Sequence, residues 1–258
     1  MKQPLLPFLA ALRFLTIIPV SWRAESDGQY FAGGLFYFPL IGLVIGSLCA
    51  FSAGILEVFL PQSLVVFSGI VILAGFSGFL HVDGLADTAD GLLSSRSREE
   101  KLAIMRDSRT GVMGVVSILV VLGGKFAALS ALPHGMLLPA LLLMPIAGRC
   151  AIVISMAMLS YARPEGGLGR LFYSAQTMRA AWFCTAFSGV LLCLSVVFSA
   201  ISWKTSVWLV LVLTATLLLF VRWCRQSLGG ATGDTLGAIC EISELMTAVS
   251  FTIGLNGK

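Results

Sequence analysis

Residues 111–132 read GVMGVVSILVVLGGKFAALSAL, and this stretch decides the fold class, because Lys125 is its only charged residue. A helix needs about 20 mostly apolar residues to cross the hydrocarbon core of a bilayer. Similar apolar windows occur at residues 33–60, 64–80, 136–160, 181–201 and 205–222, with a weaker one at 235–256 that either spans or re-enters. We therefore predict an all-α, polytopic integral membrane protein with about 6–7 transmembrane helices.

The composition agrees with a membrane location. Charged residues make up 12% of the 258 residues, against about 25% in a soluble domain, and the mean hydropathy is +0.94. The net charge of +4 is too small to indicate a nucleic-acid partner, and the six cysteines form no CxxC pair that would suggest a zinc site. We expect residues 1–258 to form a single membrane-embedded domain, with residues 4–20 as an interfacial or re-entrant segment.

Basic residues are distributed unevenly among the connections between the apolar windows. The short connections at 61–63 and 133–135 contain no lysine or arginine, and 202–204 contains one. Several basic residues lie instead in the N-terminal segment, in 81–110, in 161–180 and in 222–233. When the windows are taken as successive spans, every basic segment falls on the same side. Because lysine and arginine accumulate on the cytoplasmic side, we predict a cytoplasmic N-terminus.

Three aspartates follow the second apolar window, in the sequence HVDGLADTADG at 81–91. On a helix they lie within about 60° of one another, so that Asp83, Asp87 and Asp90 share one face. Carboxylates this close repel one another, which favours a bound cation, and hard oxygen ligands suit Mg²⁺. The alternative is a solvated acidic cap at a helix end. We predict an active-site loop at about 81–110, with His81 binding substrate or relaying a proton.

A second polar segment, RDSRTG at 106–111, precedes the third span. Arg106 and Arg109 could neutralise phosphate oxygens, since arginine offers bidentate geometry. Asp107 could be a further metal ligand or the base that activates a hydroxyl. The alternative is ordinary basic flanking of a span on the cytoplasmic side.

A third polar segment begins with the glycine-rich turn GGATGDTLG at 229–237 and extends to about residue 244. Such a turn can expose backbone N–H groups to a phosphate, and acidic residues that enter a membrane segment favour a functional interpretation. The candidate substrate-binding residues here are Gly230, Thr232, Asp234, Glu241 and Glu244. The alternative is a helix-packing turn whose glutamates face a polar cavity.

Two basic residues lie inside apolar windows and need anionic partners there. For Lys125, Glu57 is one conceivable partner. Arg149 could reach an anionic ligand.

The chain closely resembles the cobalamin synthase family, adenosylcobinamide-GDP ribazoletransferase, over almost its full length. The resemblance is carried by RFLTIIP at 13–19, FPLIG at 38–42, GFLHVDGLADTADG at 78–91, MRDSRTG at 105–111 and GATGDTLGAICE at 230–241. The third of these, placed directly after a span, is the most specific.

The resemblance implies a Mg²⁺-dependent reaction in the bacterial cell inner membrane, with the active site facing the cytoplasm. α-Ribazole or its 5′-phosphate displaces GMP from adenosylcobinamide-GDP and forms adenosylcobalamin or its phosphate. Asp83, Asp87 and Asp90 are then expected to hold the metal over the pyrophosphate, and Asp107 to complete the metal shell or act as base. Arg106 and Arg109 would bind phosphate, and the 229–244 segment would form the facing wall. A homo-oligomer is possible, because the sequence does not determine the oligomeric state.

Two other functions are compatible with parts of the sequence. A CDP-alcohol phosphotransferase with a lipid acceptor uses similar chemistry, but its motif has Ala-Arg after the first Asp-Gly, where this chain has Ala86-Asp87. A cation transporter would place its acids near the membrane midplane, in discontinuous and repeated helices. Here the acids cluster at the cytoplasmic boundary and no internal repeat is visible.

Overall fold

The computed structural model describes residues 5–20, 30–133, 135–163 and 165–255, and its regular structure within these ranges is helical apart from one bridge between Tyr161 and Ala231. Six helical segments are long and apolar enough to span a membrane, or seven if a bent helix pair counts as one. They are Phe31–Leu56 (α2 at Phe31–Gly34, η2 at Leu35–Tyr37 and α3 at Phe38–Leu56), α7 (Val112–Ser130), α8 (Leu137–Met158), α9 (Thr177–Val197), α10 (Trp203–Leu228) and α11 (Gly233–Leu255). The prediction of an all-α membrane protein with 6–7 spans is confirmed, and the uncertain last window forms a full-length helix.

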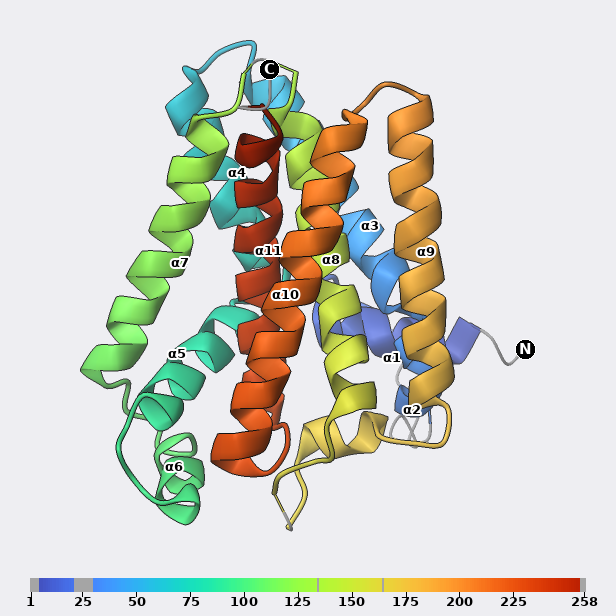
Figure 1. Cartoon of the computed structure of the whole chain (residues 1–258). Coiled ribbons are helices and arrows are strands. Elements are labelled where there is room, and N and C mark those ends of the chain that lie inside the picture. The colour runs from blue at the N-terminus through green and yellow to red at the C-terminus, as the bar shows by residue number, and fades with distance from the viewer. Residues whose placement is uncertain (1–4, 21–29, 134, 164, 256–258) are drawn as a thin grey trace.

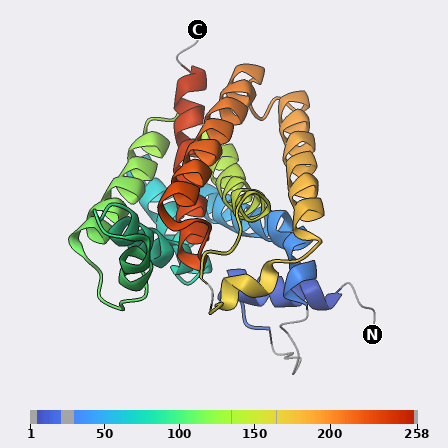
Figure 2. The same cartoon turned by 60° about the horizontal axis from the view of Figure 1, so that its bottom comes forward.

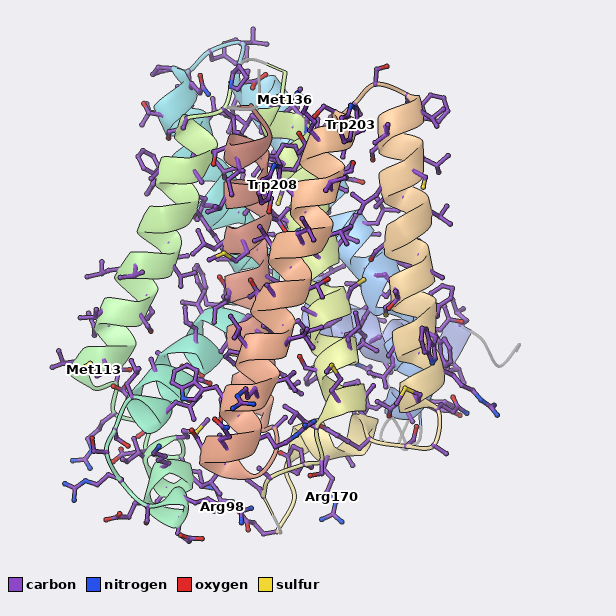
Figure 3. The ribbon with its side chains drawn as sticks, viewed as in Figure 1. Arg98, Met113, Met136, Arg170, Trp203 and Trp208 are labelled. Atoms are coloured by element: carbon purple, nitrogen blue, oxygen red, sulfur yellow. The ribbon has the colours of Figure 1, made fainter. Side chains whose placement is uncertain are left out.

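The long helices stand side by side as a bundle with two distinct ends (Figure 1). The lower end in that view carries α6 (Arg98–Ile104) and the connection with the short helix η3 (Leu168–Phe172), and Arg98 and Arg170 lie there in Figure 3. The upper end carries the short connections, with Met136 and Trp203 (Figure 3). The basic connections therefore share one end of the bundle, as the sequence indicates.

Helix α1 (Leu5–Leu15) lies across the lower end of the bundle rather than along it (Figure 2). Its 11 residues extend about 16 Å, roughly half the hydrocarbon thickness of a bilayer. This agrees with the interfacial segment expected at 4–20.

A sharp bend separates α4 (Gln62–Phe76) from α5 (Leu80–Leu92), whose axes differ by 88°. The bend is a Schellman motif: the Gly78 N–H donates to the Gly75 carbonyl (2.8 Å) and the Phe79 N–H to the Ala74 carbonyl (3.0 Å). Gly78 and Phe79 both have φ near +60°, a region that glycine enters freely but phenylalanine rarely does. As a result, the aspartate-bearing helix α5 runs across the bundle axis instead of continuing the span.

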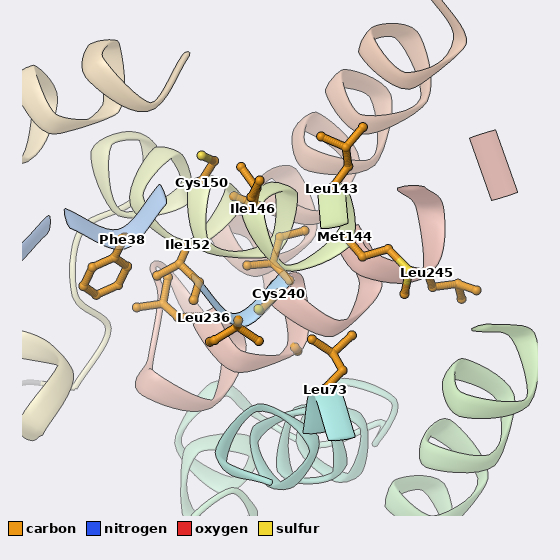
Figure 4. Close-up of a cluster of buried hydrophobic side chains, with 14 of the residues drawn as sticks. Phe38, Leu73, Leu143, Met144, Ile146, Cys150, Ile152, Leu236, Cys240 and Leu245 are labelled. Atoms are coloured by element: carbon orange, nitrogen blue, oxygen red, sulfur yellow. The ribbon is translucent and has the colours of Figure 1, made fainter. Parts of the chain in front are cut away.

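The core is built around α8 and α11, which are the most buried of the spanning helices. Gly42 and Gly46, one turn apart on α3, allow its backbone to touch α8: a Cβ at Gly42 would lie 2.7 Å from the Pro145 carbonyl oxygen, and one at Gly46 would collide with the Leu142 carbonyl. Small residues at this spacing are a common basis of helix packing in lipid. Figure 4 shows the apolar side chains that fill the space between these helices.

Candidate active site

The site forms where α5 crosses the first turns of α11. A Cβ at Gly84 would lie 2.8 Å from the Asp234 carbonyl oxygen, and one at Gly237 would lie 3.2 Å from the His81 Cα. Glycine at both positions therefore allows the two backbones to approach closely. The crossing brings the aspartates of α5 next to Asp234, the second residue of α11.

Carboxylates of α5 and α11 interact at this crossing. Asp83 is exposed, whereas Asp87 and Asp234 are partly buried. Burial, together with the negative charges of Asp83, Asp234 and Asp90, raises the pKa of Asp87 to about 6. The cluster that the sequence places on one helix face thus gains a fourth member, Asp234, from the third polar segment.

Asp90 joins α5 to the start of α7. One of its carboxylate oxygens accepts a hydrogen bond from the Gly111 N–H (2.6 Å) and the other from the Gly114 N–H (2.8 Å). These are N–H groups at a helix start that have no acceptor within the helix, and they favour a negative charge. Asp90 therefore fixes α5 against α7, in addition to any part it takes in binding a metal.

Arg163 is the basic residue of the cluster, and the sequence pattern did not single it out. Its Nη2 donates to Asp234 Oδ2 at 2.6 Å, and Thr232 Oγ1 donates to the same oxygen at 3.3 Å. Arg163 belongs to the 161–180 connection, where the sequence suggests only basic flanking of a span. Its pairing with Asp234 depends on the fold, so no local signal could have revealed it.

A cavity of about 270 Å³ opens beside the carboxylates. Its polar wall includes Asp83, Asp234, Arg163 and Tyr161. Its apolar wall comes from α1, α3, α8, η3 and α11 and includes Phe14, Phe38, Ile152, Met156, Phe172 and Leu236. His81 also lines it, and the buried Nε2 of His81 has no hydrogen-bond partner among the described residues. The cavity therefore offers charge at one wall and an apolar, largely aromatic surface at the other.

The RDSRTG segment pairs its charges locally. Asp107 accepts hydrogen bonds from the backbone N–H and the Nε of Arg109, both at 3.0 Å, and from Arg109 Nη2 at 2.6 Å. These bonds lower the pKa of Asp107 to about 2, which makes its carboxylate a weak base. Arg106 forms an exposed ion pair with Glu165. In this structure the charged side chains of the segment do not join the carboxylate cluster, although its last residue, Gly111, donates its backbone N–H to Asp90.

The glycine-rich turn packs against the segment that follows α8. The Ala231 N–H donates to the Ser160 carbonyl and the Ala162 N–H to the Ala231 carbonyl, both at 2.8 Å, and a Cβ at Gly230 would collide with the Ser160 carbonyl. Thr232 is fully buried and caps α11 by accepting from the Thr235 N–H at 3.2 Å. Gly230 and Thr232 therefore support the site from outside the described cavity wall, whereas Gly233, Asp234 and Gly237 of the same turn line it.

Glu241 and Glu244 lie deeper in the bundle, fully buried in an ion-pair network. Lys125 Nζ donates to Glu241 Oε2 and to Glu244 Oε2, each at 2.6 Å, and Arg149 Nη1 donates to Glu244 Oε1. The suggestion that Glu57 partners Lys125 is wrong, because α11 rather than α3 faces α7 at this depth. The structure does not bring the two glutamates to the carboxylate cluster, and their charges are balanced by Lys125 and Arg149.

The carboxylate cluster could supply part of the ligands of a divalent cation, with a substrate supplying the others. Among the residues that the structure describes, no three His, Cys, Asp or Glu side chains are arranged to hold a metal ion by themselves. Mg²⁺ is usually bound by one or two carboxylates together with substrate phosphates and water. Burial and, after it, the neighbouring carboxylates raise the pKa of Asp87, and a bound cation would offset the repulsion among these carboxylates.

Fold and site together define a polytopic helical membrane protein with a carboxylate-rich site at one end of its helix bundle. The model of the cobalamin-5-phosphate synthase family matches residues 7–252, and the chain belongs to this family.

Several proteins named adenosylcobinamide-GDP ribazoletransferase are similar to this chain over nearly its full length. One from Roseiflexus sp. (strain RS-1) is 42% identical, over 97% of this chain and 90% of the relative. Those from Pseudomonas putida (strain GB-1) and Acetivibrio thermocellus are 36% and 34% identical, over 97% and 94% of this chain and 100% and 96% of the relatives. No solved structure matches the chain.

Proposed function

We propose that this protein is an adenosylcobinamide-GDP ribazoletransferase. It transfers the adenosylcobinamide-phosphate group from adenosylcobinamide-GDP to α-ribazole or α-ribazole 5′-phosphate and releases GMP. The observation that carries the proposal is the full-length similarity to relatives of this name. The carboxylate cluster beside a cavity with one polar and one apolar wall supports it.

Some site residues supply charge to the reacting groups, and others hold the helices and side chains in position. Breaking a pyrophosphate depends on positioning and charge stabilisation more than on covalent help from the protein. Asp83 and Asp87 are the side chains that would hold Mg²⁺, which when bound neutralises charge on the pyrophosphate oxygens. Arg163 holds Asp234 in place and offers donors to a phosphate. Asp90 keeps α5 in register with α7.

We place the active site on the cytoplasmic face of the inner membrane. Arg98 and Arg170, from two of the basic connections, lie at the lower end of the bundle (Figure 3), towards which α5 also lies (Figure 1), and basic residues favour the cytoplasm. Single cysteines test this orientation: one at Arg96, beside α6, should react with an impermeant maleimide only after cells are opened. One at Ser199, between α9 and α10, should react in intact cells. The reverse pattern would place the site outside.

Purified protein in liposomes tests the activity. With Mg²⁺, adenosylcobinamide-GDP and α-ribazole 5′-phosphate, we expect equal amounts of GMP and adenosylcobalamin phosphate, and no product with excess chelator. A CDP-activated lipid donor with an alcohol acceptor should give no CMP; release of CMP would favour the CDP-alcohol phosphotransferase alternative. Cation flux without nucleotide would favour a transporter.

A further inference from the structure

We infer that the apolar wall of the cavity is the subsite for the heteroaromatic base of the acceptor, with His81 donating a hydrogen bond to the free ring nitrogen of that base. This inference rests on the proposed function, since it assigns one substrate to one part of the same site. It names an acceptor whose base is a substituted benzimidazole.

The apolar wall presents a cluster of aromatic rings. The ring centroid of Phe172 lies 4.7 Å from that of Phe14 and 5.6 Å from that of Phe38. These rings come from three separate elements, η3, α1 and α3, so the cluster fixes the connection after α8 against the crosswise N-terminal helix. Rings held in this way offer a rigid surface for a flat, apolar ligand at little cost in side-chain entropy.

The apolar wall continues along one side of α8. Figure 4 shows Ile152 on the side of α8 that faces Phe38 and Leu236, whereas Ile146 and Cys150 point away from these residues. Ile152 and Met156, one turn apart, both line the cavity and are buried. This wall provides dispersion contacts and few hydrogen-bonding groups.

Hydrogen-bonding capacity distinguishes the possible occupants. A benzimidazole attached to ribose keeps one ring nitrogen as an acceptor and has no N–H donor. His81, whose Nε2 is buried and unpartnered in the described structure, can donate the one hydrogen bond that this ring nitrogen accepts. Guanine carries an N–H, an amino group and a carbonyl, and burying these against phenylalanine, isoleucine and methionine would leave them without partners, which is costly.

The polar wall accounts for the other end of the acceptor. With the base against the rings, the attacking hydroxyl of its ribose points towards Asp83, Asp234 and Arg163, where the donor pyrophosphate is proposed to bind. Donor and acceptor then meet at the carboxylate cluster, and the guanine and corrin groups stay outside the cavity.

Narrowing the cavity tests the subsite. We expect Ile152→Phe to raise the KM for α-ribazole 5′-phosphate at least tenfold and to leave the KM for adenosylcobinamide-GDP within twofold. Ile154→Phe is the matched control, because Ile154 lies on the same helix but lines a different cavity, between α8, α9 and α10; it should leave both values within twofold. Ile152→Ala should fold and should reduce the preference for dimethylbenzimidazole over bulkier bases.

The hydrogen bond to His81 has its own readout. An indole riboside, in which CH replaces the free ring nitrogen, should be about tenfold poorer than its benzimidazole counterpart with the wild-type protein, and His81→Phe should abolish this difference. A merely structural role of His81 would lower both activities and keep their ratio.

The experiments distinguish failure of the proposed function from failure of the base subsite. If the wild-type protein transfers nothing, the proposed function fails. If it transfers normally but Ile152→Phe and Ile152→Ala leave acceptor KM and base preference unchanged, or Ile152→Phe raises the donor KM instead, the base subsite is refuted and the activity stands.

Discussion

Replacing Lys125 with methionine removes one charge from the buried network of Lys125, Glu241, Glu244 and Arg149. The network as it stands has two positive and two negative groups, all at most 2% exposed. Without Lys125, two carboxylates share one guanidinium inside the spans. Removing one partner of a buried ion pair costs about 3–5 kcal/mol, because it leaves an uncompensated charge. For a chain of this size, this corresponds to a fall in Tm of about 6–20 °C.

The double variant Lys125→Met/Glu241→Gln restores neutrality and is the informative comparison. A neutral buried set often costs little relative to the intact ion pairs, so we expect the double variant to recover at least half of the lost Tm. Thermal unfolding in one detergent at one heating rate, followed by circular dichroism, measures all three proteins. Transfer activity is measured in parallel at 20 °C.

Two results would refute this reasoning. A Tm for Lys125→Met within 2 °C of the wild type would show that the network carries little stability. A double variant that regains its Tm but loses the transfer activity that Lys125→Met retains would show that Glu241 takes part in binding substrate, as the sequence suggests, rather than only in holding α11 to α7.

Three further predictions concern the site. Asp87→Asn should lower kcat at least 100-fold without lowering Tm, since it removes a charge that burial and the neighbouring carboxylates disfavour, whereas Glu99→Gln on the exposed helix α6 should leave both kcat and Tm unchanged; an active Asp87→Asn would remove the metal-site proposal. Gly84→Ala should destabilise the protein by about 1–3 kcal/mol, since its Cβ would meet the Asp234 carbonyl; Gly123→Ala, with open space around it, should be neutral or slightly stabilising. Asp90→Ala should lower Tm by removing the acceptor at the start of α7, and an unchanged Tm and kcat would exclude that role.

Hydropathy and helical spacing are local properties, and what they predict agrees with the structure. The apolar windows correspond to helices, and Asp83, Asp87 and Asp90 share one helix. Gly78 also carried a local signal, since a glycine in the left-handed region commonly ends a helix. The 88° bend it produces was not predicted, because Phe79 gives no sign of its positive φ.

Contacts between distant segments could not be predicted from the sequence alone. Arg163 lies 71 residues from Asp234 and Lys125 lies 116 residues from Glu241, so no spacing rule connects either pair. The aromatic wall likewise combines Phe14, Phe38 and Phe172 from three elements, each of which looks like ordinary apolar sequence by itself. In a membrane protein an apolar residue can face either the lipid or the protein core, so its sequence does not tell whether it lines a cavity.

Mn²⁺ binding in the presence of donor tests the central claim most directly, because Mn²⁺ can replace Mg²⁺ and is observed by electron paramagnetic resonance. With adenosylcobinamide-GDP and no acceptor, we predict that the wild-type protein binds one Mn²⁺ and that Asp83→Asn and Asp87→Asn each weaken the binding at least tenfold. Equal affinity in all three proteins would mean that the carboxylates at the crossing of α5 and α11 do not hold the metal.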